Sequence, residues 1–108
     1  MEMHQVRYFL AVARTRNFTR ASEECNVSQP SLSRAIKLLE AELGGELFRR
    51  ERPQAQLTTL GQYMQPLLKQ CYESAIGARS LADAIKKRAV GSLTIIFSRT
   101  IDFAAVVP

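Results

Sequence analysis

The sequence has no tryptophan, one histidine, two cysteines and no apolar run long enough to span a bilayer. Cys25, Cys71 and His4 lie too far apart for a zinc site of recognisable spacing. The N-terminus lacks the basic, apolar and small-residue regions of a secretory signal. We therefore expect a cytoplasmic protein with no metal site and no membrane partner. Both cysteines are expected to be reduced and buried, and the alternative is a redox role or a bridge between Cys71 and its copy in a dimer.

Groups that would carry catalysis are also missing. There are no paired carboxylates placed for a cleft, no nucleophile beside a base and no glycine-rich phosphate loop. Glu40, Glu42 and Glu46 are expected to form a solvated acidic patch. We predict that the chain is not an enzyme and needs no cofactor.

The composition indicates one domain of ordinary size with a short appendage. The chain has 108 residues, of which 46% are hydrophobic, and that fraction is too high for a disordered tail. Its formal net charge of +5 favours a polyanionic partner, although the placement of the charge matters more than its sum.

Apolar spacing predicts three helices in the first half. The first covers about 4–14, and the second covers about 18–25 with Asn17 or Thr19 as its cap. The third is capped by Ser28 and ends at Gly44. Its inward stripe is Leu32, Ile36, Leu39 and Leu43, and its outer face carries Pro30, Ser33, Arg34 and Lys37.

This order of helices is that of a helix-turn-helix over about 18–37. Ala21 is small where two helices cross, Val27 is apolar in the turn, and Asn26 tolerates a left-handed backbone. Two short extended pieces, 46–49 and 55–57, follow and predict a β-hairpin wing with a basic tip. Several apolar side chains could form a platform on which the bases of single-stranded nucleic acid stack, but their inward positions favour core packing. These are Tyr8, Phe9, Phe18, Leu47 and Phe48.

A long helix is expected after the wing, because Thr58 is a good cap and no strong breaker appears before Gly91. Pro66 should bend this helix or cost about 3 kcal/mol. A heptad pattern predicts a coiled-coil seam that needs a second chain. The seam residues are Leu60, Met64, Leu67, Cys71, Ser74, Ala78, Leu81 and Ile85.

The end of the chain reads as the start of another domain. Residues 93–97 have the composition of a buried strand, yet the chain offers this strand nothing to pair with. We therefore predict a winged helix-turn-helix domain over 1–58, a linker and dimerisation helix over 59–90, and the start of a truncated domain over 91–108. The expected fold class is mainly α.

The motifs together resemble the LysR-type transcriptional regulators over essentially the whole chain. The matching segments are Val6–Ala13, Phe18–Ser22, Val27–Arg34, Leu39–Gly44, Leu47–Arg50 and Leu57–Gly61. The resemblance implies a winged DNA-binding domain, a dimerising linker helix and a C-terminal domain for a small effector. Residues 91–108 would open that last domain.

The resemblance also implies which residues contact DNA. Base readout falls on Gln29, Pro30, Ser31, Ser33 and Arg34. The candidates for phosphate contacts are Thr19, Arg20, Ser28, Lys37, Arg49, Arg50 and Arg52. Gln29 suits adenine and Pro30 suits a thymine methyl, whereas Arg34 suits either guanine or a phosphate. The family often has arginine at the position of Pro53, and here the arginine comes one residue earlier, at Arg52.

In the family the linker helices pair antiparallel. Applied to this seam, the pairs are Leu60 with Ile85, Met64 with Leu81, Leu67 with Ala78, and Cys71 with Ser74. We expect a homodimer on a dyad-symmetric promoter site, a tetramer for the full-length protein, and control by an effector. The alternatives are an assembly module that has lost DNA binding, or a winged-helix regulator of another family.

Overall fold

The computed structural model describes residues 1–49 and 54–88. The chain divides into two compact units, Met1–Ser74 and Ala75–Pro108. The described residues of the second unit are the C-terminal part of the last helix and Arg88. Several expectations lie outside the described residues: the wing-tip Arg50 and Arg52, the strand at 93–97 and the truncated domain.

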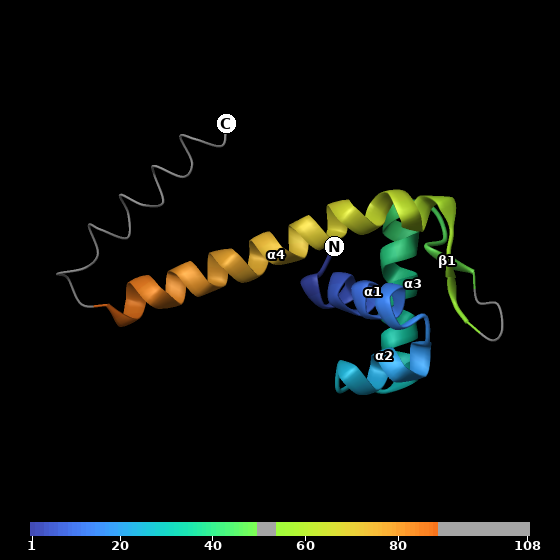
Figure 1. The fold of residues 1–108 in the computed structure, drawn as a ribbon, viewed down its shortest axis with the longest axis horizontal. Helices are drawn as coiled ribbons and strands as arrows, with labels where there is room; N and C mark the ends of the chain where they lie inside the picture. The colour runs from blue at the N-terminus through green and yellow to red at the C-terminus, as the bar shows by residue number, and fades with distance from the viewer. Residues whose placement is uncertain (50–53, 89–108) are drawn as a thin grey trace. The chain divides into compact units, whose positions relative to one another are not determined.

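Three helices form the body of the first unit. They are α1 (Met3–Thr15), α2 (Phe18–Glu24) and α3 (Gln29–Leu43), and each packs against the other two (Figure 1). The predicted stripe of α3 is confirmed at Leu32, Ile36 and Leu39, whereas Leu43 is only partly buried. In α1 the spacing predicts Val6, Phe9, Leu10 and Ala13, but the structure buries Val6, Phe9, Tyr8, Ala11 and Val12 and leaves Leu10 and Ala13 partly buried. Fully buried members of the core are Val6, Phe9, Val12, Ala21, Leu32, Ile36, Leu39 and Leu47.

Side-chain caps and left-handed residues set the helix ends. Asn17 Oδ1 accepts a hydrogen bond from the backbone N–H of Arg20 at 2.9 Å, so Asn17 caps α2, and Thr19 lies within its first turn. Ser28 Oγ accepts from the N–H of Ser31 at 3.2 Å and caps α3, as predicted. Asn26 (φ 58°) and Gly44 (φ 82°) adopt the left-handed conformation that ends a helix.

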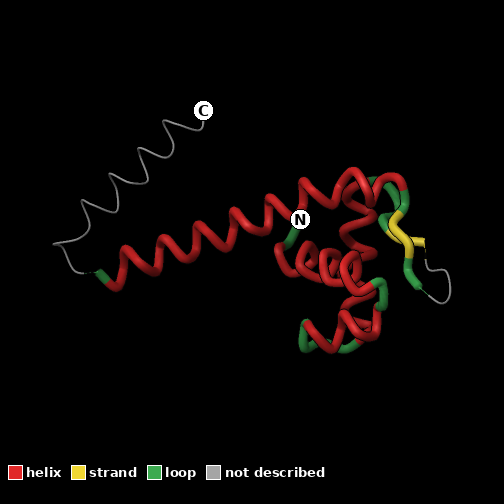
Figure 2. The backbone as a smooth tube through the Cα atoms, viewed as in Figure 1, coloured by secondary structure: helices red, strands yellow, loops and turns green. Residues whose placement is uncertain are grey.

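The wing is shorter than the sequence suggests. Strands β1 (Phe48–Arg49) and β2 (Gln56–Leu57) pair antiparallel, with Phe48 opposite Leu57 (Figure 2). The expected strand residues 46–47 and 55 are not part of the two strands. The N–H of Leu47 donates to Oε2 of Glu40 at 2.7 Å, and the N–H of Ala55 donates to the carbonyl of Arg16 at 3.0 Å. One cross-strand bond continues past the strands, from the N–H of Thr58 to the carbonyl of Leu47 at 3.0 Å.

The expectation that Glu40 belongs to a solvated acidic patch is wrong. Its Oε2 accepts hydrogen bonds from the backbone N–H groups of Leu47 at 2.7 Å and Phe48 at 3.4 Å. The carboxylate therefore joins α3 to the first wing strand. Glu42 lies 2.9 Å from the N-terminal ammonium of Met1, and this hydrogen bond raises the pKa of the ammonium.

Aromatic side chains pack in the core, as their inward positions predict. Tyr8, Phe9 and Phe48 are buried, and Phe18 is half-buried against them. The Phe48 ring centroid lies 5.3 Å from that of Phe9 and 5.6 Å from that of Phe18. A platform for stacked bases would need these faces to be open to solvent, so the core interpretation is confirmed.

The last helix, α4 (Thr59–Lys87), begins at the cap that the sequence predicts and continues through Pro66. Thr58 Oγ1 accepts from the N–H of Gly61 at 3.0 Å. Near its start α4 packs on the chain's own core, where Gly61 and Leu68 are buried. None of the helices in the described ranges combines the length and the apolar character that a bilayer crossing requires.

Candidate nucleic-acid interface

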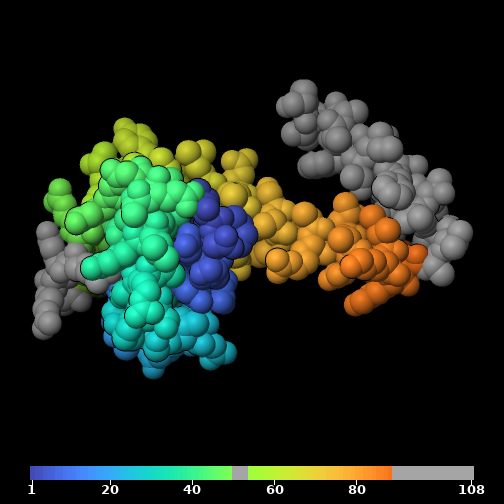
Figure 3. Space-filling model, turned by 180° about the vertical axis from the view of Figure 1, so that it is seen from behind, coloured from blue at the N-terminus to red at the C-terminus, as the bar shows by residue number. Residues whose placement is uncertain are grey.

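One face of α3 is buried and the opposite face carries the predicted base-reading residues. Leu32, Ala35, Ile36 and Leu39 are buried in the core. Pro30, Ser31, Arg34 and Lys37 are exposed, and Gln29 and Ser33 are half-buried. The structure therefore places the predicted residues on the part of α3 that is open to solvent, and Figure 3 shows the surface of this helix in green to teal.

Hydrogen bonds organise the polar side chains of this surface into two pairs. Gln29 Nε2 donates to Ser33 Oγ at 2.9 Å, and Ser28 Oγ donates to Ser31 Oγ at 2.9 Å. Because these bonds hold the side chains in place before any ligand arrives, a ligand would meet a partly ordered surface. The pairing of Gln29 with Ser33 was not evident from the sequence, although a spacing of one helical turn allows it.

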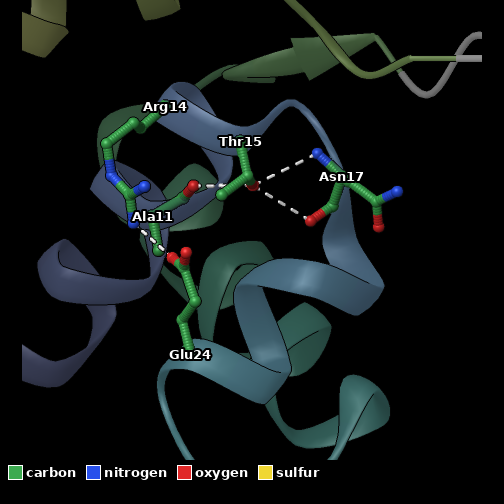
Figure 4. Close-up of polar contacts among 5 residues, drawn as sticks. All are labelled: Ala11, Arg14, Thr15, Asn17 and Glu24. Atoms are coloured by element: carbon green, nitrogen blue, oxygen red, sulfur yellow. Dashed lines mark hydrogen bonds and ion pairs between the residues drawn. The ribbon is translucent and has the colours of Figure 1, made fainter.

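The arginine and lysine side chains of the described residues differ in whether they have an ion-pair or aromatic partner within the protein. Arg14 forms an ion pair with Glu24 that ties α1 to α2 (Figure 4), and the Arg7 guanidinium lies 5.3 Å from the Tyr8 ring centroid. Within 1–49 and 54–88, the side chains of Arg20, Arg34 and Lys37 make no ion pair. Their positive charges therefore remain available to an anionic partner.

The wing contributes one described candidate, Arg49, which is exposed on β1. Thr19 is exposed at the start of α2, close to Arg20. The described candidates for phosphate contacts thus come from the start of α2, from the N-cap and body of α3, and from β1.

The predicted seam on α4 is covered to different extents. Leu60 and Met64 pack against the chain's own core, whereas Leu67 is 58% exposed. Farther along, Ser74 and Ala78 are exposed, and Leu81 and Ile85 are half-exposed. The seam prediction omitted Tyr63, which is 72% exposed and lies one turn before Leu67. The spacing of these two residues was the signal that could have identified it.

The expectation that both cysteines are buried is wrong for Cys71. Cys25 is buried as predicted, but Cys71 is exposed. The reason is that Cys71 belongs to the seam side of α4 and not to the side that carries Gly61 and Leu68. The described residues contain no group of three histidine, cysteine or acidic side chains that could hold a metal ion.

Residues 3–62 match the family model described as "Bacterial regulatory helix-turn-helix protein, lysR family". The chain is 44% identical over 91 residues to the HTH-type transcriptional regulator BudR of Klebsiella aerogenes, a match that covers 84% of this chain and 59% of BudR. It is 33% identical over 106 residues to the HTH-type transcriptional regulator IlvR of Caulobacter vibrioides, covering 98% of this chain and 36% of IlvR. The chain thus spans less than two thirds of either relative.

Two solved structures resemble the fold closely. The BenM_DBD in complex with catB site 1 DNA has a TM-score of 0.75 and 31% identity, and the match covers 82% of this chain and 99% of the BenM chain. The CbnR_DBD in complex with DNA has a TM-score of 0.69 and 37% identity, covering 78% of this chain and 99% of the CbnR chain.

Proposed function

Because the chain belongs to the LysR family of bacterial regulatory helix-turn-helix proteins, we propose that it binds double-stranded promoter DNA and regulates transcription. The observation that carries this proposal is the exposed face of α3, with organised polar groups and cations that have no partner among the described residues. An α-helix fits the major groove and reads base edges through side chains near its N-terminus.

Each predicted residue then has a role. Gln29 would bond the edge of adenine, Pro30 would contact a thymine methyl, and Arg34 would bond guanine or a phosphate. Ser31 and Ser33 would bond base edges through their hydroxyls. The phosphate contacts would come from Thr19, Arg20, Ser28, Lys37, Arg49, Arg50 and Arg52.

The exposed apolar residues of α4 support dimerisation through that helix. Leu67 and Tyr63 expose large apolar side chains, and a second α4 would bury them. A dimer places two recognition helices on a dyad-symmetric site. Residues 91–108 would begin a domain that binds a small effector, and we assign no catalytic step to the chain.

The test is a titration of the promoter DNA next to the gene at several salt concentrations. Affinity should fall by about one log unit per phosphate contact for each tenfold rise in salt. Arg34→Ala should cost about 1–3 kcal/mol on the specific site and relax its sequence preference. The matched control is Arg79→Ala, an exposed arginine on α4, which should bind as the wild type does. Salt-independent binding, or no binding, would instead indicate an assembly module.

A further inference from the structure

Arg16 has an unusual backbone for an arginine. It caps the C-terminus of α1 with φ 57° and ψ 27°, in the left-handed region where the β-carbon crowds the backbone and glycine is preferred. Its side chain is exposed and, within 1–49 and 54–88, makes no ion pair. The fold therefore keeps a long cation at a position where glycine would be less strained. This combination points to a use for the side chain.

The position of Arg16 is tightly held between two elements of the interface. Thr15 Oγ1 donates to the carbonyl of Ala11 at 2.8 Å and accepts from the N–H of Asn17 at 3.3 Å, which fixes the turn before α2 (Figure 4). The carbonyl of Arg16 accepts from the N–H of Ala55 at 3.0 Å, which attaches the wing to this turn. Arg16 thus lies where the start of α2 meets β2.

A pocket of about 200 Å³ opens beside Arg16. Among the described residues its polar side chains are Arg16, Gln56 of β2 and Gln62 of α4, and no acidic side chain of 1–49 or 54–88 lines it. A guanidinium with two carboxamides offers several N–H donors and one positive charge, which is the chemistry that a phosphate group prefers.

We propose that Arg16 and its two neighbouring carboxamides bind a phosphodiester of the DNA strand that α2 crosses. This rests on the proposed function, in which α3 lies in the major groove. In that arrangement the first helix of the motif crosses the sugar-phosphate backbone beside the groove. Arg16 lies two residues before Phe18, the first residue of that helix, and its carbonyl bonds the wing, so the same DNA strand would pass over it.

Arg16→Gly gives the sharpest test because it should affect folding and binding differently. Glycine relieves the strain at φ 57° while it makes the unfolded chain more flexible, so the thermal midpoint should stay the same or rise. On a mixed-sequence duplex, affinity should fall roughly tenfold for each protomer that contacts the DNA, the effect of losing one charge-assisted hydrogen bond. The slope of log affinity against log salt should decrease in magnitude by about 0.9 per protomer.

Two further variants separate this contact from net charge. Arg16→Lys keeps the charge and should retain most of the salt slope. Lys69→Gln removes one charge from an exposed position on α4 and should leave the slope unchanged. A slope for Arg16→Gly equal to that of the wild type would overturn the proposal.

Failure of this inference is distinguishable from failure of the proposed function. If the wild type shows no salt-dependent duplex binding, both fail. If the wild type binds and Arg34→Ala weakens it while Arg16→Gly does not, only the role of Arg16 fails. Inorganic phosphate is compared with chloride at equal ionic strength as a second probe. Saturable phosphate binding that disappears in Arg16→Gly, with duplex affinity unchanged, would assign the pocket to a free anion and overturn the proposal.

Discussion

Gly61 lies at the start of α4 against the loop that enters the wing. A β-carbon at this position would lie 2.3 Å from the carbonyl oxygen of Leu47 and 2.8 Å from Cδ2 of Leu57. The Leu47 carbonyl also accepts from the N–H of Thr58, so it cannot retreat without loss of that hydrogen bond. We therefore predict that Gly61→Ala destabilises the protein, although alanine is the better helix former.

The magnitude follows from two opposing effects. Helix propensity favours alanine by up to about 1 kcal/mol. Overpacking typically costs about 1–3 kcal/mol, and contact with backbone favours the upper end. The free energy of unfolding should fall by about 2 kcal/mol, which lowers the thermal midpoint by about 10 °C for a chain of this size.

Gly77 provides a matched control on the same helix. Among the described residues, no atom outside the helix's own backbone and the two neighbouring residues lies within 4 Å of the position that its β-carbon would occupy. Gly77→Ala should therefore gain up to about 1 kcal/mol of helix stability. Thermal and urea unfolding followed by far-UV circular dichroism measures both variants. If Gly61→Ala is as stable as the wild type, the close approach of α4 to Leu47 is refuted.

Two other substitutions test the wing and the dimer. Glu40→Ala should cost about 2 kcal/mol in urea unfolding because two backbone N–H groups lose their acceptor. Glu40→Gln should cost less than about 1 kcal/mol, because both N–H groups bond the same carboxylate oxygen and the amide oxygen of glutamine can take its place. Equal losses of unfolding free energy in the two variants would contradict this role. Leu67→Glu should shift the dimer toward monomer in sedimentation, whereas Ser80→Glu on another side of α4 should not. A dimer that persists in Leu67→Glu would place the interface elsewhere.

The sequence by itself determined the helices, their caps and most of the core. Apolar spacing identified most of the buried face of α3 and part of that of α1, and Ser28, Asn26 and Gly44 mark boundaries through their own side chains or backbone preferences. These features are local, because a helix and its cap depend on residues within a few positions of one another. The same locality let the motif on α3 indicate the proposed reading surface.

Only the tertiary structure decided the contacts between distant segments. In the sequence Glu40 looks like a solvated acid, and only the structure shows that its carboxylate accepts from the N–H groups of Leu47 and Phe48. In the sequence Arg16 looks like an ordinary turn residue and Gly61 like an ordinary helix residue. Only the structure shows that Ala55 bonds to the carbonyl of Arg16 and that Leu47 lies against Gly61. Packing also decided that Met64 faces the core while Tyr63 is exposed. Such contacts depend on how the helices and the wing are placed in space, which no periodicity along the chain records.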